Sequence, residues 1–470
     1  MATSVKKNFA YNSLLTAANY IIPLITYPYV SRVIGVSGIG ICGFVDSVVN
    51  YFILFSMMGL NIVGVREIAA VGDDREARNR VFTSLLRLNT LTSLIAAAVL
   101  GISIPLVPAL REHWELMLIG VLRLLSNFLC IEWLYRGLEE FKYITNRTIL
   151  IRLLYVVAVF ILIRRPEDYK MYYFLLTVTI TLNAIVNLLY SKKFVSISRL
   201  VPMERRLIRP YFIMGLYAIL TSMYTTFNTL WLGLKTNPIQ VGYYASATKL
   251  FSIIIAFFTA FTSVMLPRMS AILSEGKRDE FLAWIDRTLR ILFAVAVPLV
   301  FFIEQTADDI VRIISGAGFE GAVMPLRTVA PLILIIGLEQ VLVIQIMMPQ
   351  KWDKAIFINS FLGALTGVAG NLLLVSRMQA EGSAIVWLLS ELVVFSCSLF
   401  VVSRRLRYRF PISNLLMQVL VNLPLVVMLA LLYHFVSWSF WGRFGVACVL
   451  TGGYFLAVNF RSLLLMIRKC

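Results

Sequence analysis

The sequence predicts an all-α integral membrane protein of about fourteen transmembrane helices, in two six-helix lobes related by a parallel repeat, with two more helices after them. Composition is the first basis, because 59% of the 470 residues are hydrophobic and only 14% are charged. Soluble domains have about 45–50% apolar and about 25% charged residues. The second basis is a series of apolar runs, each long enough to cross a hydrocarbon core of about 30 Å as a helix. The third is a similarity between segments that lie 202 residues apart.

The apolar runs place the predicted spans. They lie at residues 9–31, 39–63, 81–104, 115–135, 148–163, 171–191, 210–232, 243–266, 288–304, 325–348, 356–376, 382–402, 414–434 and 443–463. Without the two shortest, 148–163 and 288–304, twelve spans and the same orientation of the ends would remain. Lys6 and Lys7 precede the first run, which lacks a small-residue cleavage site, so we expect an uncleaved first span.

Lys and Arg residues are distributed unequally between the two sets of predicted loops. Of the 43 in the sequence, 29 lie on the side of the N-terminus and 9 lie in the alternating loops. Loops rich in Lys and Arg face the cytoplasm. We therefore predict that both termini are cytoplasmic.

Composition also excludes several classes of function. A net charge of +18 would suggest a nucleic-acid partner in a soluble protein, but here the cations lie between apolar runs, so we expect none. The five cysteines show no ligand spacing and there are two histidines, so we expect no metal site and no cofactor. The predicted loops are too short for a catalytic domain, and we expect a protein that is not an enzyme, with no catalytic residues.

An internal repeat relates the two halves of the chain. It aligns Lys7-Asn8-Phe9 with Arg209-Pro210-Tyr211, Gly40-Ile41-Cys42 with Gly242-Tyr243-Tyr244, and Val65-Arg66-Glu67 with Pro267-Arg268-Met269. Parallel repeats of this kind are typical of transporters whose substrate site lies between the halves, although any two helical hairpins share some likeness. The repeat predicts an N-lobe at 1–191, a cytoplasmic linker at 192–209, a C-lobe at 210–402 and an added helix pair at 403–470.

Ionisable residues inside the spans indicate function, because each costs about 2.5–3.5 kcal/mol at the bilayer centre. They are Asp46, Arg87, Arg123, Glu132, Arg152, Lys249, Arg327, Glu339 and Glu391. Arg87, Arg152 and Arg327 are near enough to a span end to reach the interface or to pair structurally.

Lys249 is the strongest candidate for binding an anionic substrate. Its helical face carries small or hydroxylic residues, namely Ala245, Ser252, Ala256 and Thr259, which would leave room for substrate and water. Ammonium and guanidinium groups compensate a pyrophosphate by charge-assisted hydrogen bonds. The alternative is a structural ion pair between Lys249 and Asp46, since the repeat maps Ser47 onto Lys249.

Six further residues complete the predicted site. Arg32 and Arg123 are expected to assist Lys249, and Arg66 and Arg268 end equivalent cytoplasmic helices, where they would attract the headgroup, form a gate or only anchor the topology. Inward carboxylates suit the coupling of a proton or cation, and we assign Asp46 and Glu132 to coupling or gating.

Several motifs resemble those of the Wzx-type polysaccharide flippases, which belong to the multidrug/oligosaccharidyl-lipid/polysaccharide exporter superfamily. They are Asn8-Phe9-x-Tyr11-Asn12, Pro23-Leu24-Ile25-Thr26-x-Pro28-Tyr29-x-Ser31-Arg32, Gly64-x-Arg66-Glu67, Glu132-Trp133-x-Tyr135-x-Gly137, Val241-Gly242-Tyr243-Tyr244 and Pro267-Arg268-Met269-Ser270. The resemblance covers the first 270 residues well, and the rest matches mainly in hydropathy.

The resemblance implies an alternating-access flippase of the bacterial cytoplasmic membrane. Its partners would be undecaprenyl-pyrophosphate-linked oligosaccharide, membrane lipids and a proton or cation moved by antiport. By analogy with the peptidoglycan-precursor flippases, which also have fourteen spans, residues 414–463 would help to hold the lipid tail. The alternatives are a multidrug or metabolite exporter of the same superfamily, a membrane polymerase or acyltransferase, and a scaffold.

Overall fold

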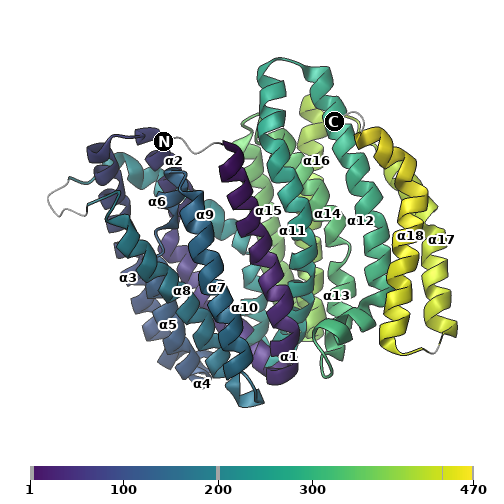
Figure 1. Ribbon diagram of the computed structural model, residues 1–470, viewed down its shortest axis with the longest axis horizontal. Coiled ribbons are helices and arrows are strands. Elements are labelled where there is room, and N and C mark those ends of the chain that lie inside the picture. Colours follow the sequence, from purple (N-terminus) through teal and green to yellow (C-terminus); the bar gives the residue numbers. More distant parts are fainter. Residues whose placement is uncertain (1–4, 197–201, 437, 468–470) are drawn as a thin grey trace. The chain divides into compact units, whose positions relative to one another are not determined.

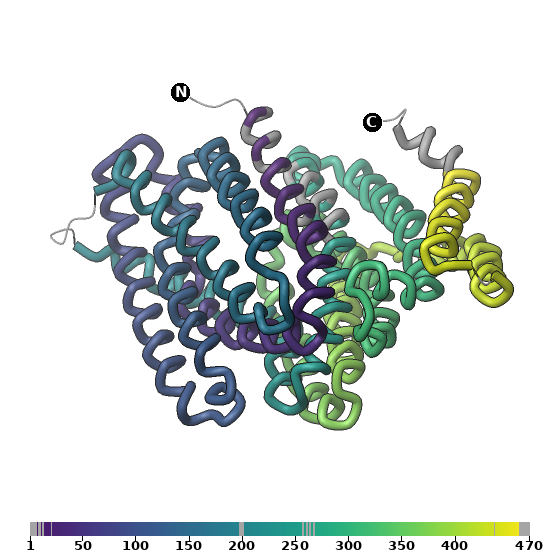
Figure 2. The backbone as a smooth tube through the Cα atoms, turned by 60° about the horizontal axis from the view of Figure 1, so that its bottom comes forward, coloured from purple at the N-terminus to yellow at the C-terminus, as the bar shows by residue number. Residues whose placement is uncertain are grey.

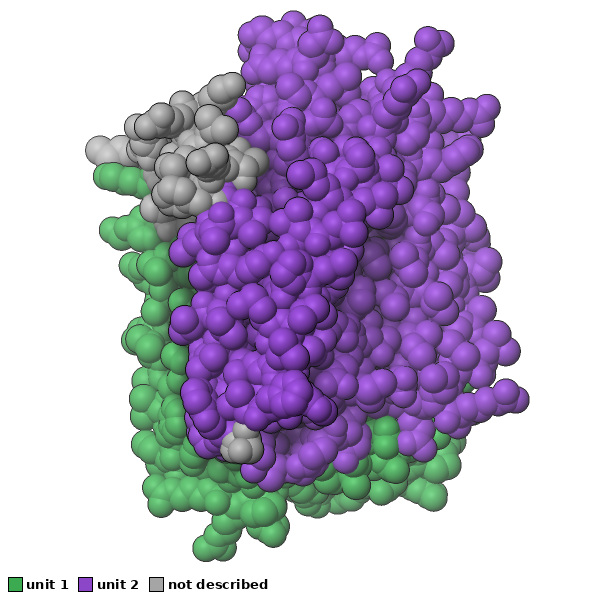
Figure 3. Space-filling model, turned by 90° about the vertical axis from the view of Figure 1, so that its right-hand side faces the viewer, with its two compact units in different colours: residues 1–242 green, residues 243–470 purple. Residues whose placement is uncertain are grey.

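The computed structural model describes residues 5–196, 202–436 and 438–467, and within these ranges every element is helical (Figure 1). Residues 1–242 and 243–470 form two compact units (Figure 3). Several residues named above lie outside the described residues, or have side chains that do: Lys6, Asn8, Phe9, Asn12, residues 197–201 of the linker, Ala256 and Pro267.

The first unit consists of helices that follow the predicted spans. They are α1 (Val5–Met57), α2 (Leu60–Val71), α3 (Arg75–Leu106), α4 (Pro108–Glu112), α5 (Trp114–Phe128), α6 (Glu132–Gly137), α7 (Phe141–Leu162), η1 (Pro166–Asp168), α8 (Tyr169–Ser191), η2 (Arg205–Leu207), α9 (Ile208–Ser222) and α10 (Thr226–Lys235). Helix α11 (Pro238–Ser274) begins in this unit and continues into the second.

The second unit contains the remaining helices. They are α12 (Arg278–Ile314), η3 (Glu320–Ala322), α13 (Val323–Val329), α14 (Leu332–Gln340), η4 (Val341–Met347), α15 (Asp353–Gly370), η5 (Asn371–Val375), α16 (Ser376–Leu406), α17 (Ile412–Phe435) and α18 (Phe440–Ile467). Helices α9 and α10 pack on α1 and α2 in the first unit, so the compact units divide at Gly242. The predicted linker at 192–209 and the predicted lobe boundaries stay predictions.

Ten segments of the described chain are long and apolar enough to cross a membrane. Two of them, Leu14–Val71 with 58 residues and Asp353–Leu406 with 54, are long enough for two crossings each, since a helix rises about 1.5 Å per residue. The first bends at Gly35, where φ is 70° (Figure 2), and the second at Gln379, where φ is 52°. Both breaks fall between predicted spans. The multi-pass membrane fold is confirmed, and the count of fourteen stays a prediction.

The outward faces of the helices are apolar, which is the reverse of a soluble protein. Leu94 and Ile102 on α3 are 59% and 62% exposed, and Leu420 on α17 is 64% exposed. Soluble monomers rarely expose contiguous apolar patches larger than a few hundred Å². These faces are therefore suited to contact with lipid tails.

Two repeat-related glycines make a reciprocal close contact in the first unit. The 202-residue relation maps Val36 onto Pro238 and Gly40 onto Gly242. A Cβ atom at Gly40 would lie 1.7 Å from the Pro238 carbonyl oxygen, and one at Gly242 would lie 2.2 Å from the Val36 carbonyl oxygen. Contacts around a two-fold axis have this reciprocity, in which residue i of one copy meets residue j of the other and the reverse. The contact supports the predicted parallel repeat.

We expect Gly40→Ala and Gly242→Ala to destabilise the protein by about 1–3 kcal/mol or more, because the added methyl group overlaps backbone. Gly101→Ala is the matched control, since Gly101 lies within α3 and a Cβ there meets nothing within 4 Å. It should be neutral or gain up to about 1 kcal/mol of helix propensity. Thermal unfolding of the purified variants measures both effects, and equal midpoints for Gly40→Ala and Gly101→Ala would contradict the close approach.

In the second unit, a buried ion pair ties the last two helices to α12. Asp309 on α12 is 2% exposed and accepts hydrogen bonds from Arg443 Nη2 at 2.7 Å and Nε at 3.1 Å. The Tyr433 hydroxyl donates to the same carboxylate at 2.5 Å. Because Tyr433 lies on α17 and Arg443 on α18, one carboxylate holds both helices, which lie side by side along α12 (Figures 1 and 2).

Asp309→Asn should lower the stability of the α17–α18 attachment by about 3 kcal/mol or more, because Arg443 would lose its buried counter-charge. The neighbouring Asp308 provides the control, since its side chain is 63% exposed and pairs with Arg327 at 2.9 Å. Exposed pairs contribute about 0–1 kcal/mol, so Asp308→Asn should have little effect. Limited proteolysis between α16 and α17 reports on the attachment, and unchanged cleavage of Asp309→Asn would refute this role.

Candidate functional site

Asp46 and Arg123, two residues of the predicted site, form an ion pair in the first unit. Asp46 lies on α1 and is half-buried, and Arg123 reaches it from α5 with 13% of its side chain exposed. Asn50 donates a hydrogen bond to the second Asp46 oxygen at 2.9 Å. The Arg123 guanidinium also lies 5.8 Å from the centre of the Tyr173 ring. Asp46 therefore has partners on both oxygens within its own unit.

Glu132 forms a second charged cluster where α6 begins. Its carboxylate accepts from Arg136 at 2.7 Å and from Arg147 at 3.3 Å. Arg147 also donates to the Asn187 side chain on α8, and only 5% of its own side chain is exposed. Arg147 falls in the loop between the predicted spans 115–135 and 148–163, so its burial is not predicted by hydropathy. Asn187, a polar residue inside the predicted span 171–191, is a signal that could have indicated a buried partner.

Arg66 and Arg268 occupy equivalent repeat positions but have different partners. Arg66 pairs with Glu67 at 3.0 Å, and Glu67 also pairs with Arg206 at 2.6 Å. The Arg268 guanidinium lies over the Trp284 ring at 4.0 Å from its centre. Both arginines are exposed. Each is thus positioned by its neighbours and still accessible to an anion.

The turn after α2 is fixed by Asp74, which caps α3 outside the membrane spans. Its carboxylate accepts from the backbone N–H groups of Ala77 at 3.0 Å and Glu76 at 2.9 Å. The hydrogen bond from Ala77 has the largest effect, and together the two bonds hold the pKa of the Asp74 carboxyl below its usual range. The cap fixes the start of α3, which follows α2, the helix that carries Arg66.

Arg32 in the first unit and Lys249 in the second unit are both exposed. Lys249 lies on α11 beside Ser252, which is exposed and donates to the Thr248 carbonyl at 2.7 Å. Arg32 lies on α1 and donates to the Pro28 carbonyl at 2.6 Å. Lys249 and Arg268 belong to the second unit, whereas the other five predicted site residues belong to the first. Their meeting at one substrate stays a prediction.

The second unit also holds a pair of carboxyl groups. Glu339 on α14 and Glu391 on α16 are neighbouring carboxyl groups, and the Trp387 indole donates to Glu391 at 3.0 Å. Glu391 is 4% exposed.

Comparison with known proteins identifies the family. Residues 5–273 match the family described as Polysaccharide biosynthesis protein. The chain belongs to this family. Two relatives share the name "Putative O-antigen transporter". The one from Escherichia coli (strain K12) is 25% identical over 85% of this chain and 97% of its own, and the one from Shigella dysenteriae is 24% identical over 57% and 67%.

Solved structures confirm the fold of this member of the polysaccharide biosynthesis family. Lipid II flippase MurJ in an inward closed conformation superposes with a TM-score of 0.77 at 14% identity, over 97% of this chain and 100% of that one. An inward-facing MATE family transporter of the MOP superfamily gives 0.62 at 15% identity, over 83% and 96%. The predicted all-helical membrane fold is confirmed.

Removing one partner of the Asp46–Arg123 pair should destabilise the protein by about 3 kcal/mol, towards the lower end for a buried pair, because Asp46 is 33% exposed. Asp46→Ala and Arg123→Ala should each lower the protein level in the membrane. The double variant should recover it, since no uncompensated charge remains. The Asp46→Ala/Lys249→Ala double is the control and should not recover. Recovery only in that control would show that Lys249 is the partner of Asp46.

Proposed function

We propose that this protein is an alternating-access flippase that moves undecaprenyl-pyrophosphate-linked oligosaccharide across the bacterial cytoplasmic membrane for cell-surface polysaccharide synthesis. The observation that carries the proposal is the match to the Escherichia coli relative named as an O-antigen transporter, which extends over 97% of that protein. A match of that extent includes both units, and membership of the polysaccharide biosynthesis family supports the same substrate class.

Exposed cations support recognition of a pyrophosphate. Lys249, Arg32, Arg66 and Arg268 all have exposed side chains, and each lies on a helix of the fold. Charge-assisted hydrogen bonds from such groups replace the water lost by an anion. In the proposed mechanism Lys249 binds the pyrophosphate, with Arg32 and Arg123 assisting. Arg66 and Arg268 attract the headgroup at the cytoplasmic ends of their helices.

Paired carboxyl groups support coupling to a proton. Membrane-embedded carboxylates serve as proton relays in pumps and transporters. Glu339 and Glu391 are neighbouring carboxyl groups on α14 and α16, and Asp46 and Glu132 each have an arginine partner that a change in protonation would release. We propose antiport of a proton or cation through these groups, with both termini in the cytoplasm.

Substitution of Lys249 tests the proposed function. Lys249→Ala should weaken substrate binding by about 10- to 100-fold, the value of a hydrogen bond to a charged group, and Lys249→Arg should retain part of it. Lys277→Ala is the matched control, because Lys277 lies in a loop and forms an exposed pair with Glu275 at 2.6 Å.

The measurement compares lipid-linked oligosaccharide in the two leaflets of cells that carry each variant in place of the wild-type gene. Accumulation in the cytoplasmic leaflet with Lys249→Ala at a normal protein level is the expected result. Normal flipping by Lys249→Ala would remove the lysine from the binding site. Normal flipping after deletion of the whole gene, with loss of drug resistance instead, would favour a multidrug exporter.

A further inference from the structure

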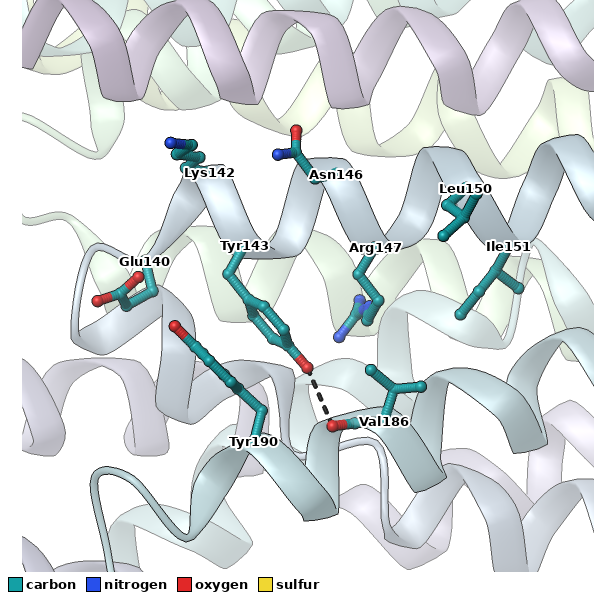
Figure 4. Close-up of a pocket in the computed structure, with 9 residues that line it drawn as sticks. All are labelled: Glu140, Lys142, Tyr143, Asn146, Arg147, Leu150, Ile151, Val186 and Tyr190. Carbon is teal, nitrogen blue, oxygen red and sulfur yellow. Dashed lines mark hydrogen bonds between the residues drawn. The ribbon is translucent and has the colours of Figure 1, made fainter.

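A pocket of about 540 Å³ lies between α7 and α8 in the first unit, and Arg147, which pairs with Glu132, is part of its lining. Figure 4 shows its lining. The lining residues are Glu140, Lys142, Tyr143, Asn146, Arg147, Leu150, Ile151, Val186 and Tyr190. Pockets of about 300–1,000 Å³ accommodate small molecules.

Aromatic side chains fix one wall of the pocket. The rings of Tyr143 and Tyr190 stack with their centres 3.8 Å apart, and Tyr135 packs on both at 4.9 and 5.7 Å. The Tyr143 hydroxyl donates to the Val186 carbonyl at 3.1 Å, which links α7 to α8 (Figure 4). Contacts within the protein therefore position this wall.

Two cations, Lys142 and Arg147, line the pocket from different faces of α7 (Figure 4). Arg147 is held by Glu132 at 3.3 Å and by Thr148 at 3.0 Å, yet its buried Nε atom has no hydrogen-bond partner among the described residues. Lys142 is exposed, and the Lys193 ammonium lies 5.6 Å from the centre of the Tyr190 ring. A buried Nε is not accessible to a ligand in the pocket, so Arg147 contributes its positive charge to the lining rather than this hydrogen bond.

One carboxylate also lines the pocket. Glu140 lies beyond Tyr143, away from Arg147 (Figure 4). Glu132 is already paired with Arg136 at 2.7 Å. The Arg147 end of the pocket therefore remains suited to a negative charge.

The opposite end of the pocket is apolar and open. Leu150 is 60% exposed, and Leu154, one turn further along α7, is 56% exposed. On α8, Val186 and Leu182 are 37% and 39% exposed. An apolar strip thus runs from the cationic end of the pocket towards the middle of the span. A ligand with one anionic end and one apolar end matches this arrangement.

We propose that this pocket binds one anionic phospholipid as a resident ligand. The headgroup phosphate accepts a hydrogen bond from Lys142 close to the positive charge of Arg147, and an acyl chain lies along Leu150 and Leu154. Arginine and lysine both suit phosphate, and the charge pattern predicts the Lys142 end to be cytoplasmic, where anionic lipids attract basic residues. The lipid bound here is not transported, so the site does not depend on the proposed flippase function.

Lipid binding to the full-length protein in detergent tests the proposal. Native mass spectrometry with phosphatidylglycerol should show one lipid bound more tightly than phosphatidylcholine. Lys142→Gln should weaken binding about fivefold, the effect of one basic residue near an anionic surface. Leu150→Trp should fill the pocket and weaken binding at least tenfold, whereas Leu153→Trp, at a residue that is 54% exposed on the same helix but outside the lining and the apolar strip, should keep the pocket open.

Three outcomes would overturn the proposal. The first is equal binding of phosphatidylcholine and phosphatidylglycerol. The second is unchanged phosphatidylglycerol binding in both Lys142→Gln and Leu150→Trp, at unfolding midpoints like that of wild type. The third is thermal stabilisation by inorganic phosphate equal to that by phosphatidylglycerol at the same concentration, because it would show an anion site that needs no lipid.

Discussion

The hydrocarbon core of a bilayer offers no hydrogen bonds, and that constraint governs the architecture of this protein. Each unsatisfied backbone group there costs several kcal/mol, so the chain crosses as helices. All the secondary-structure elements of the described residues are helices. Reversals inside the long helices occur at Gly35 and Gln379, which adopt positive φ values. The same constraint acts on side chains, which explains why charged groups within the helices are found with partners.

Three ion pairs show how that cost is met. Asp46–Arg123 and Asp309–Arg443 join helices far apart in sequence, Glu132–Arg147 joins the consecutive helices α6 and α7, and each pair lies within a single compact unit. Breaking such a pair is expensive, so these contacts specify which helices lie together. Cations such as Lys249 differ because their side chains are exposed. The structure thus separates charges that hold helices together from charges that a soluble anion or headgroup can reach.

The sequence was sufficient to predict the fold class, because the thickness of the bilayer sets how many consecutive apolar residues a spanning helix needs. Helix positions followed from the same rule, and the breaks at Gly35 and Gln379 fell where spans were predicted to end. Partners of individual charges could not be predicted in this way. Hydropathy placed Arg147 in the loop between two predicted spans. It cannot show that Asn187, on another helix, and Glu132 bind this side chain. Arg66 and Arg268 occupy equivalent repeat positions, yet one meets a carboxylate and the other an indole.

The reciprocal contact of Gly40 and Gly242 has an evolutionary consequence. After an ancestral duplication, most positions of the two copies are free to diverge, because each packs against its own surroundings. Residues 36–40 and 238–242 instead pack against each other's backbone. A larger side chain arising in either copy would meet the unchanged carbonyl of the other, and no compensating substitution can shrink a backbone. The two glycines are therefore expected to persist together while the remaining likeness between the halves decays, leaving this contact as the most durable record of the duplication.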